Sequence, residues 1–239
     1  DSLAEQETRD ELGIGVVRDA LADLLFPGTS TIQTRARYFL FVPWTYARHE
    51  RAGTPATKLA KAARRDEIAL VEVLKRSDDP EGTIGREAGQ TLQRLPSSIY
   101  WAGLETWGIR RMALSREQYH RAFDALLQRR ALTAAEAHDG DTGASVRTWD
   151  PALPAPPDNL PEGASFALPY AEAEYLQHRI LQIRPSPLLA HLVSKTSAVD
   201  ATPFVWAHPE WEGFSEGHRA QVEHARLFSE GMLGAALLY

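Results

Sequence analysis

The sequence contains no cysteine, so disulfide bonds and thiolate metal sites are excluded. Because disulfides belong mainly to secreted proteins, their absence favours a reducing, cytoplasmic location. No apolar run reaches the roughly 18 residues that a membrane-spanning helix needs. The first residues, DSLAEQETRDELG, are acidic and polar and do not resemble a signal peptide. We therefore predict a cytoplasmic protein without membrane association.

The common catalytic motifs are also missing. The sequence has no GxxxxGK[ST] or GxGxxG phosphate-binding loop, no HExxH zinc motif and no GxSxG nucleophile elbow. Glu174 and His178 stand four residues apart on an expected helix, which is a spacing for two metal ligands, but the same spacing is typical of a solvated ion pair. We predict no catalytic residue, no metal site and no cofactor, although catalytic groups gathered from distant positions stay an open alternative.

Positive charge is concentrated in the middle of the chain. The 239 residues carry a net charge of −6, with 44% hydrophobic and 24% charged residues, as in an ordinary soluble domain. Residues 35–130 hold 18 basic and 11 acidic side chains, whereas residues 131–239 hold 6 basic and 14 acidic ones. This distribution indicates either an internal fit between acidic and basic parts or an anionic partner for the middle third.

Apolar periodicity predicts a mostly α fold. Ser115 and Gln118 form the pattern of a capping box at the start of one helix, and Pro43 is expected to end or kink another. The expected helices cover residues 13–26, about 31–42, about 55–76, two short stretches within 83–109, and then 115–130, 170–183, 185–193 and 214–239. We predict a helical N-terminal domain with helix-turn-helix-like elements, followed by a smaller helical C-terminal part.

Composition divides this sequence into three parts. Residues 1–130 are predicted to form a basic-centred helical domain, and residues 131–168, which are rich in proline and glycine, a linker or long surface loop. Residues 169–239 are predicted to form an acidic helical part. The last stretch, GMLGAALLY, has no capping signal, so we expect this part to continue beyond Tyr239 in a longer protein.

The stretch LFPGTSTIQTRARYFLFVPW, residues 25–44, has two interpretations. In the first, a turn between two helices presents hydroxyl, amide and guanidinium groups, which contact bases and phosphates, from Thr31, Gln33, Thr34, Arg35 and Arg37. In the second, the aromatic residues that follow are buried, and the two arginines pair internally with an acidic side chain of the first helix, Asp19 or Asp23.

Two further groups extend the predicted nucleic-acid-binding set. Lys58, Lys61 and Arg65 share one face of the helix expected at 55–76, and Arg86 and Arg94 precede a second aromatic stretch. The aromatic side chains of that stretch are expected to pack in the core, with stacking on unpaired bases as the alternative; they are Tyr100, Trp101 and Trp107.

Two long blocks, RDELGIG followed by LFPGTSTIQTRARYFLFVPW, and IGREAGQTLQRLPSSIYW, resemble an uncharacterised bacterial family of unknown function. The resemblance covers residues 8–130 well and the acidic C-terminal part loosely. It implies no known activity and carries no catalytic residue. It does imply gene neighbourhoods with helicases and nucleases of phage-defence or restriction type.

From these observations we predict a non-catalytic subunit of a bacterial anti-phage defence or restriction-type complex. It would bind DNA, or dock a nucleic-acid-processing partner, and its partners would be other protein subunits of helicase or nuclease type. Two alternatives stay open. One is a purely structural protein–protein adaptor in such a complex, and the other is a metal-dependent nuclease without a recognisable motif.

Overall fold

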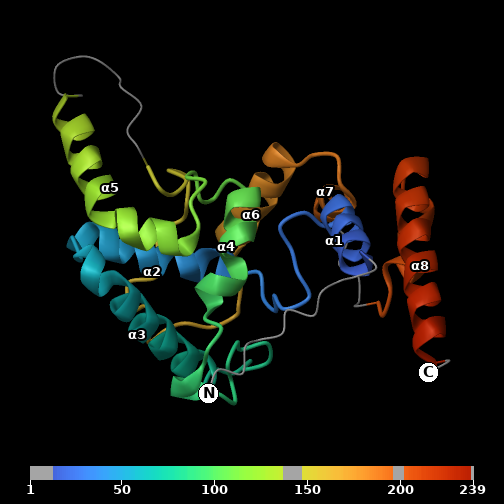
Figure 1. Cartoon of the computed structure of the whole chain (residues 1–239), viewed down its shortest axis with the longest axis horizontal. Helices are drawn as coiled ribbons and strands as arrows, with labels where there is room; N and C mark the ends of the chain where they lie inside the picture. The colour runs from blue at the N-terminus through green and yellow to red at the C-terminus, as the bar shows by residue number, and fades with distance from the viewer. Residues whose placement is uncertain (1–12, 137–146, 196–201, 238–239) are drawn as a thin grey trace. The chain divides into compact units, whose positions relative to one another are not determined.

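The computed structural model describes residues 13–136, 147–195 and 202–237, which form helices joined by turns (Figure 1). Within these residues there is no β-strand, only one isolated antiparallel bridge between Arg110 and Trp149. The predicted mostly α fold is thus confirmed. No helix among the described residues is long and apolar enough to cross a membrane. The helices are α1 (Ile14–Leu25), α2 (Tyr38–Ala52), α3 (Ala56–Leu74), α4 (Pro96–Thr106), α5 (Arg116–Glu136), α6 (Tyr170–Ile183), α7 (Leu188–Val193) and α8 (Glu216–Leu237), with 3₁₀ turns η1 (Gly89–Thr91), η3 (Val205–Ala207) and η4 (Trp211–Gly213).

The chain divides into two compact units, which differ from the predicted division at 130 and 169. The central unit comprises Ser30–Arg179, and the terminal unit joins the residues up to Thr29 with those from Ile180 onward. Within the terminal unit, the α1 helix packs with α8. Our expectations about the chain ends concern residues outside the described ranges.

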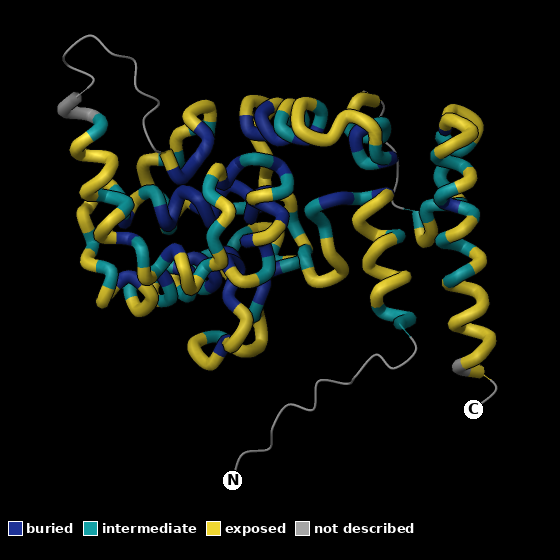
Figure 2. The backbone as a smooth tube through the Cα atoms, turned by 45° about the horizontal axis from the view of Figure 1, so that its top comes forward, coloured by how far each residue is buried: buried dark blue, intermediate teal, exposed yellow. Residues whose placement is uncertain are grey.

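Helix α2 forms the centre of the central unit. Every residue from Tyr38 to Tyr46 is buried; buried backbone is drawn dark blue in Figure 2. We predicted that Pro43 would end or kink a helix covering 31–42, but α2 continues through it to Ala52. A proline in a helix removes one backbone hydrogen bond. Burial of the large side chains around it offsets that loss, since each contributes about 1.5–3 kcal/mol.

Residues 30–37 form short turns and irregular backbone instead of the predicted start of a helix, so the helix-turn-helix interpretation of this stretch is wrong. The reason is a contact with α4. The Tyr100 hydroxyl accepts hydrogen bonds from the backbone N–H groups of Thr34 (2.9 Å) and Arg35 (3.1 Å), and donates one to the Arg35 carbonyl (2.9 Å). Backbone groups occupied in this way are not available for a helical ladder. Residues 30–37 therefore have a structural role, because hydrogen bonds to Tyr100 attach this stretch to α4.

Helix α4 is capped by a residue of α3. Its own first residues supply no side-chain cap. Instead, the Glu67 carboxylate accepts hydrogen bonds from the Ser97 backbone N–H (2.7 Å) and from the Ser97 hydroxyl (2.8 Å). Glu67 is only 1% exposed. Burial raises the pKa of Glu67 to about 7, although the hydrogen bonds from Ser97 and the charges of Arg116 and Arg64 oppose the increase.

The described part of the predicted linker packs onto the central unit. Trp149, Ala164 and Phe166 are buried, and the backbone N–H of Asp150 donates to the Ile109 carbonyl at 2.8 Å. The apolar side chains of residues 147–168 occur singly among prolines and polar residues, so this part of the sequence shows no periodic apolar pattern. For this reason residues 147–168 looked like a linker in the sequence.

The predicted capping box at the start of α5 is confirmed. The Ser115 backbone N–H donates to the Gln118 side chain at 2.7 Å, and the Gln118 backbone N–H donates to the Ser115 hydroxyl at 3.1 Å. The helix is longer than predicted and ends at Glu136. Arg130 therefore lies inside the helix, where it pairs with Glu50 of α2 at 3.3 Å.

The terminal unit has a small core of its own. Leu25, Leu188, Phe214 and Val222 are buried together. Much of the surrounding apolar surface is exposed, including Val16 on α1 and Leu233 and Leu237 on α8. This unit therefore has the sparser core of the two.

Candidate cationic groove

The first half of α3 presents a row of cations to solvent. Lys58, Lys61 and Arg65 are exposed, as predicted from their spacing, while Leu59 and Ala63 on the opposite side are buried. Lys58 is the third residue of a helix that begins at Ala56. The amino end of a helix carries a partial positive charge and disfavours cations by roughly 0.3–1 kcal/mol. The placement therefore opposes helix stability and favours the binding of an anion.

A turn brings this row against the end of α2. Gly53 ends α2 in the left-handed conformation (φ 61°), and the Thr54 N–H donates to the His49 carbonyl at 3.1 Å, a common way to end a helix. Helix α3 starts three residues later. Between the two helices lies a groove of about 860 Å³, which is within the range of ligand-binding sites. It is lined by Arg48, His49, Ala52, Thr54, Thr57, Lys58, Lys61, Ala62, Arg65 and Asp66.

Positive charge exceeds negative charge in this cationic groove. Its one carboxylate, Asp66, makes a short ion pair with Arg48 and lies 3.1 Å from the Arg65 Nε. Lys58 and Lys61 have no ion-pair or hydrogen-bond partner among the described side chains. Four cations thus face a single anion, which gives a net charge of +3 when His49 is neutral.

His49 joins the two helices at the base of the groove. Its Nδ1 lies 3.1 Å from the Thr54 hydroxyl, and its Nε2 lies 3.0 Å from Asp66 Oδ2 without the alignment of a hydrogen bond. Burial lowers the pKa of His49, and the nearby Asp66 carboxylate only partly opposes this effect. The ring is therefore neutral at pH 7, so it adds no charge to the groove.

The other predicted nucleic-acid contacts lie outside the groove. Arg37 is buried (6% exposed) and donates two hydrogen bonds of 2.7 Å to the Glu172 carboxylate. Arg35 pairs with Asp79 at 2.8 Å. The internal pairing that we weighed is therefore present, but with these two acids and not with Asp19 or Asp23, the partners we expected.

The remaining residues of the predicted set are dispersed. The Gln33 amide donates to the Ile99 carbonyl at 3.4 Å, and the Thr34 hydroxyl donates to the Gly82 carbonyl at 2.6 Å. Arg86 lies 3.6 Å from Glu87. Thr31 and Arg94 are exposed. None of these residues lines the cationic groove.

Aromatic side chains near these residues belong to the core. Tyr100, Trp101 and Trp107 are all buried, and the Trp107 ring stacks on Phe39 with 3.8 Å between ring centroids. Their faces are covered by the protein, so they offer no platform for bases.

The sequence interpretation missed Arg48, His49 and Asp66. Expecting the second helix to end near Pro43, we did not extend it to Arg48, although Arg48 and Arg51 precede Gly53 and Pro55, a typical junction of two helices. No group of three or more His, Asp or Glu within the described ranges is placed to hold a metal ion. Glu174 and His178 are both exposed on α6.

A sequence model for a family of unknown function, DUF6361, matches residues 1–239. No curated protein matched the chain, and no solved structure matched it.

Proposed function

Because the chain belongs to the DUF6361 family of unknown function, we propose its function from its own geometry: it binds nucleic acid through the cationic groove. The observation that carries this proposal is the excess of four cations over one carboxylate between α2 and α3, with Lys58 and Lys61 unpaired among the described side chains. Nucleic-acid backbones are bound by such clustered Lys and Arg side chains.

The groove suits phosphate contacts better than base readout. Its cations are Arg48, Lys58, Lys61 and Arg65, and the two arginines share the single carboxylate of Asp66. No aromatic ring and no amide side chain lines the groove. Contacts of this kind position a strand or duplex without reading its sequence. We therefore propose binding of DNA or RNA without strong sequence preference.

We further propose that the protein acts as a non-catalytic subunit of a bacterial anti-phage defence or restriction-type complex. The support is the gene neighbourhood that the family resemblance implies. The binding partners would be helicase or nuclease subunits, which the protein would help to hold on nucleic acid.

Binding is tested by fluorescence anisotropy with labelled single-stranded and duplex DNA at several salt concentrations. The triple variant Lys58→Glu/Lys61→Glu/Arg65→Glu is expected to lose binding at low salt. Single replacements by alanine are expected to reduce the slope of log affinity against log salt by about one each.

The matched control reverses three cations outside the groove. Arg86→Glu/Arg94→Glu/Arg111→Glu changes the net charge of the chain by the same amount, and none of these side chains lines the groove. We expect this variant to retain most of the affinity. Equal loss in both triple variants would mean that only the net charge matters, and unchanged binding in the groove variant would remove the proposal.

A protein–protein adaptor is the second candidate function. It is favoured by an apolar groove of about 470 Å³ between α1 and α8, lined by Leu21, Phe228 and Met232 among others. An adaptor would co-purify with its partner subunits after nuclease treatment, and Leu21→Asp would disrupt that complex without affecting binding to DNA. Dissociation of the complex by nuclease alone would contradict the adaptor.

A further inference from the structure

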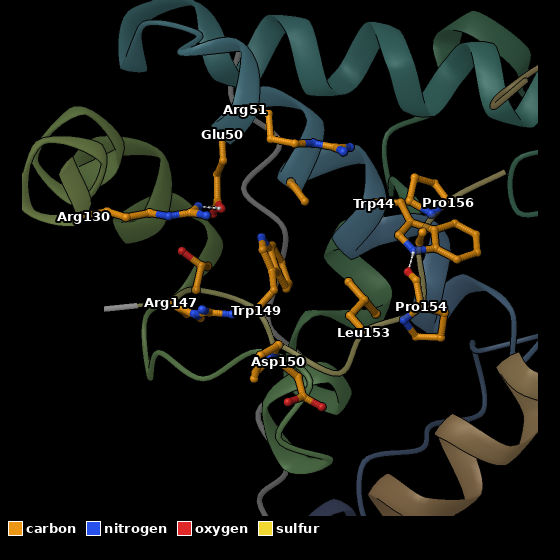
Figure 3. A pocket seen from close by; sticks show the side chains of 14 residues that line it. Trp44, Glu50, Arg51, Arg130, Arg147, Trp149, Asp150, Leu153, Pro154 and Pro156 are labelled. Atoms are coloured by element: carbon orange, nitrogen blue, oxygen red, sulfur yellow. Dashed lines mark hydrogen bonds and ion pairs between the residues drawn. The ribbon is translucent and has the colours of Figure 1, made fainter. Parts of the chain in front are cut away.

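A second cavity, of about 360 Å³, lies beside the last turns of α2 and is independent of the cationic groove. Its walls come from α2, from Arg130 of α5 and from the segment that runs from Arg147 to Pro156. Figure 3 shows these side chains from close by. All of them belong to the central unit.

The far wall of this cavity is held in place by hydrogen bonds. The Trp44 indole N–H donates to the Pro154 carbonyl at 2.7 Å, and the Asp150 backbone N–H donates to the Ile109 carbonyl at 2.8 Å. Trp44 itself is buried in α2. The cavity is therefore formed before any ligand enters, which reduces the entropy lost on binding.

Three arginines from three different elements line the cavity: Arg51, Arg130 and Arg147. Arg130 lies 3.3 Å from a Glu50 carboxylate oxygen, and the other Glu50 oxygen accepts a 2.8 Å hydrogen bond from the Tyr119 hydroxyl. Arg51 and Arg147 have no ion-pair or hydrogen-bond partner among the described side chains. The lining thus contains three guanidinium groups, of which only that of Arg130 lies on the Glu50 carboxylate, and these four side chains carry a net charge of +2.

The other acidic residue of the lining does not reduce this charge. Asp150 accepts a hydrogen bond from the Tyr175 hydroxyl at 3.1 Å and pairs with Arg179 at 3.3 Å. In Figure 3 its carboxylate lies on the opposite side of Trp149 from Glu50. Its charge is neutralised by a group outside the cavity.

The wall also contains an unsatisfied donor. Trp149 is 6% exposed, and its indole Nε1 is buried with no hydrogen-bond partner among the described residues. An indole N–H can only donate. A buried donor without an acceptor costs about 1–3 kcal/mol. A ligand that brings acceptor oxygens to this wall removes that cost.

We propose that this cavity binds a small organic phosphate monoester, with Arg51 and Arg147 on the phosphate and the Trp149 indole N–H donating to one of its oxygens. A phosphate monoester carries close to two negative charges at neutral pH, which matches the local excess. Its oxygens accept the paired N–H groups of a guanidinium, which is the geometry that arginine recognises best.

The cavity has room for the organic group as well. Leu153, Pro154 and Pro156 provide an apolar wall next to the cationic rim. The rings of Trp44 and Trp149 are packed in the core, so the site holds the organic group by apolar contact and not by stacking between aromatic faces. The shared chemistry fits a free mononucleotide or sugar phosphate, and equally the terminal phosphate of a nucleic-acid strand.

The proposal is tested by NMR on the full chain. The protein has six tryptophans, and the Trp149→Phe variant assigns one indole N–H signal. Titration with a nucleoside 5′-monophosphate is expected to shift the Trp149 signal in a saturable way. Replacement of Arg51 or Arg147 by glutamine is expected to weaken binding about tenfold, the effect of one charge-assisted hydrogen bond.

Three comparisons make the outcome specific. Arg129→Gln changes a neighbouring exposed arginine that does not line the cavity and should leave the affinity unchanged. The groove variant Lys58→Glu/Lys61→Glu/Arg65→Glu should also retain phosphate binding, so a failure of the nucleic-acid proposal is recognised separately. Oligonucleotides with a 5′-phosphate or a 5′-hydroxyl distinguish a strand end from a free monoester.

A Trp149 signal that does not move with any phosphate monoester at millimolar concentration, or that moves equally with a dicarboxylate, would overturn the proposal.

Discussion

Replacing Glu67 by glutamine is expected to change how the stability of the protein depends on pH. The Glu67 carboxyl ionises near its ordinary pKa of 4.5 in the unfolded chain, whereas its pKa in the folded protein is about 7 because burial disfavours the charged form. Below pH 4.5 the group is protonated in both states and adds no penalty. Between these two values the folded state holds a proton that the unfolded state has lost, so stability falls as the pH rises. Above about 7 the penalty is complete.

The size of this effect follows from the two pKa values. Their difference, at 1.36 kcal/mol for each pH unit, corresponds to about 3 kcal/mol. Glutamine has no titratable group but keeps an oxygen that can accept the Ser97 N–H. The free energy of unfolding of Glu67→Gln relative to the wild type is therefore expected to increase by about 3 kcal/mol from about pH 4.5 to about pH 8.

Urea denaturation at a series of pH values, followed by tryptophan fluorescence, measures this difference. Glu87→Gln, which removes one exposed carboxylate, is the control for the change in net charge. A difference between Glu67→Gln and the wild type that stays constant across the pH range would refute the reasoning. If the variant does not fold, the carboxyl carbon of Glu67 can be titrated directly in the wild type, where a midpoint near 4.5 would refute it equally.

Three further substitutions test other parts of the structure. Arg37→Met is expected to lower the free energy of unfolding by about 3–5 kcal/mol, because it leaves the Glu172 carboxylate buried without its partner; a loss below about 1 kcal/mol in urea denaturation would contradict this. Ser115→Ala removes the capping box with Gln118 and should cost about 1 kcal/mol by the same measurement, so unchanged stability would be evidence against its importance. Lys58→Glu should stabilise α3 by up to about 1 kcal/mol through the helix dipole and weaken DNA binding; thermal denaturation and anisotropy check both effects, and a less stable or tighter-binding variant would disagree.

Local signals in the sequence predicted much of the helical structure. Apolar spacing predicted helices at residues 13–26 and 170–183, which agree with α1 to within one residue at each end and with α6 throughout. The Ser115–Gln118 pattern located the start of α5. The exposed cationic row of α3 was also predictable, because Lys58, Lys61 and Arg65 repeat at the spacing of one helix face. These features depend on neighbours within a few positions.

Features that depend on distant residues were not predictable. Nothing near Arg37 indicates that its partner lies 135 residues away at Glu172, or that the Tyr100 hydroxyl binds the backbone of residues 34 and 35 outside a helix. The continuation of α2 past Pro43 depends on burial against α3 and α4, which outweighs the local preference. The second cavity was missed for the same reason, since its arginines come from three separate stretches of sequence.

The capping of α4 by a glutamate thirty positions earlier has a practical consequence. A peptide with only the sequence Pro96–Thr106 is shorter than the helices that are stable alone in water. It also lacks the Glu67 carboxylate, which caps the first turn of α4. Such a peptide should be largely unstructured, whereas a fragment that keeps residues 56–106 together retains the carboxylate. Truncated versions of the protein made for binding studies should therefore never separate these two helices.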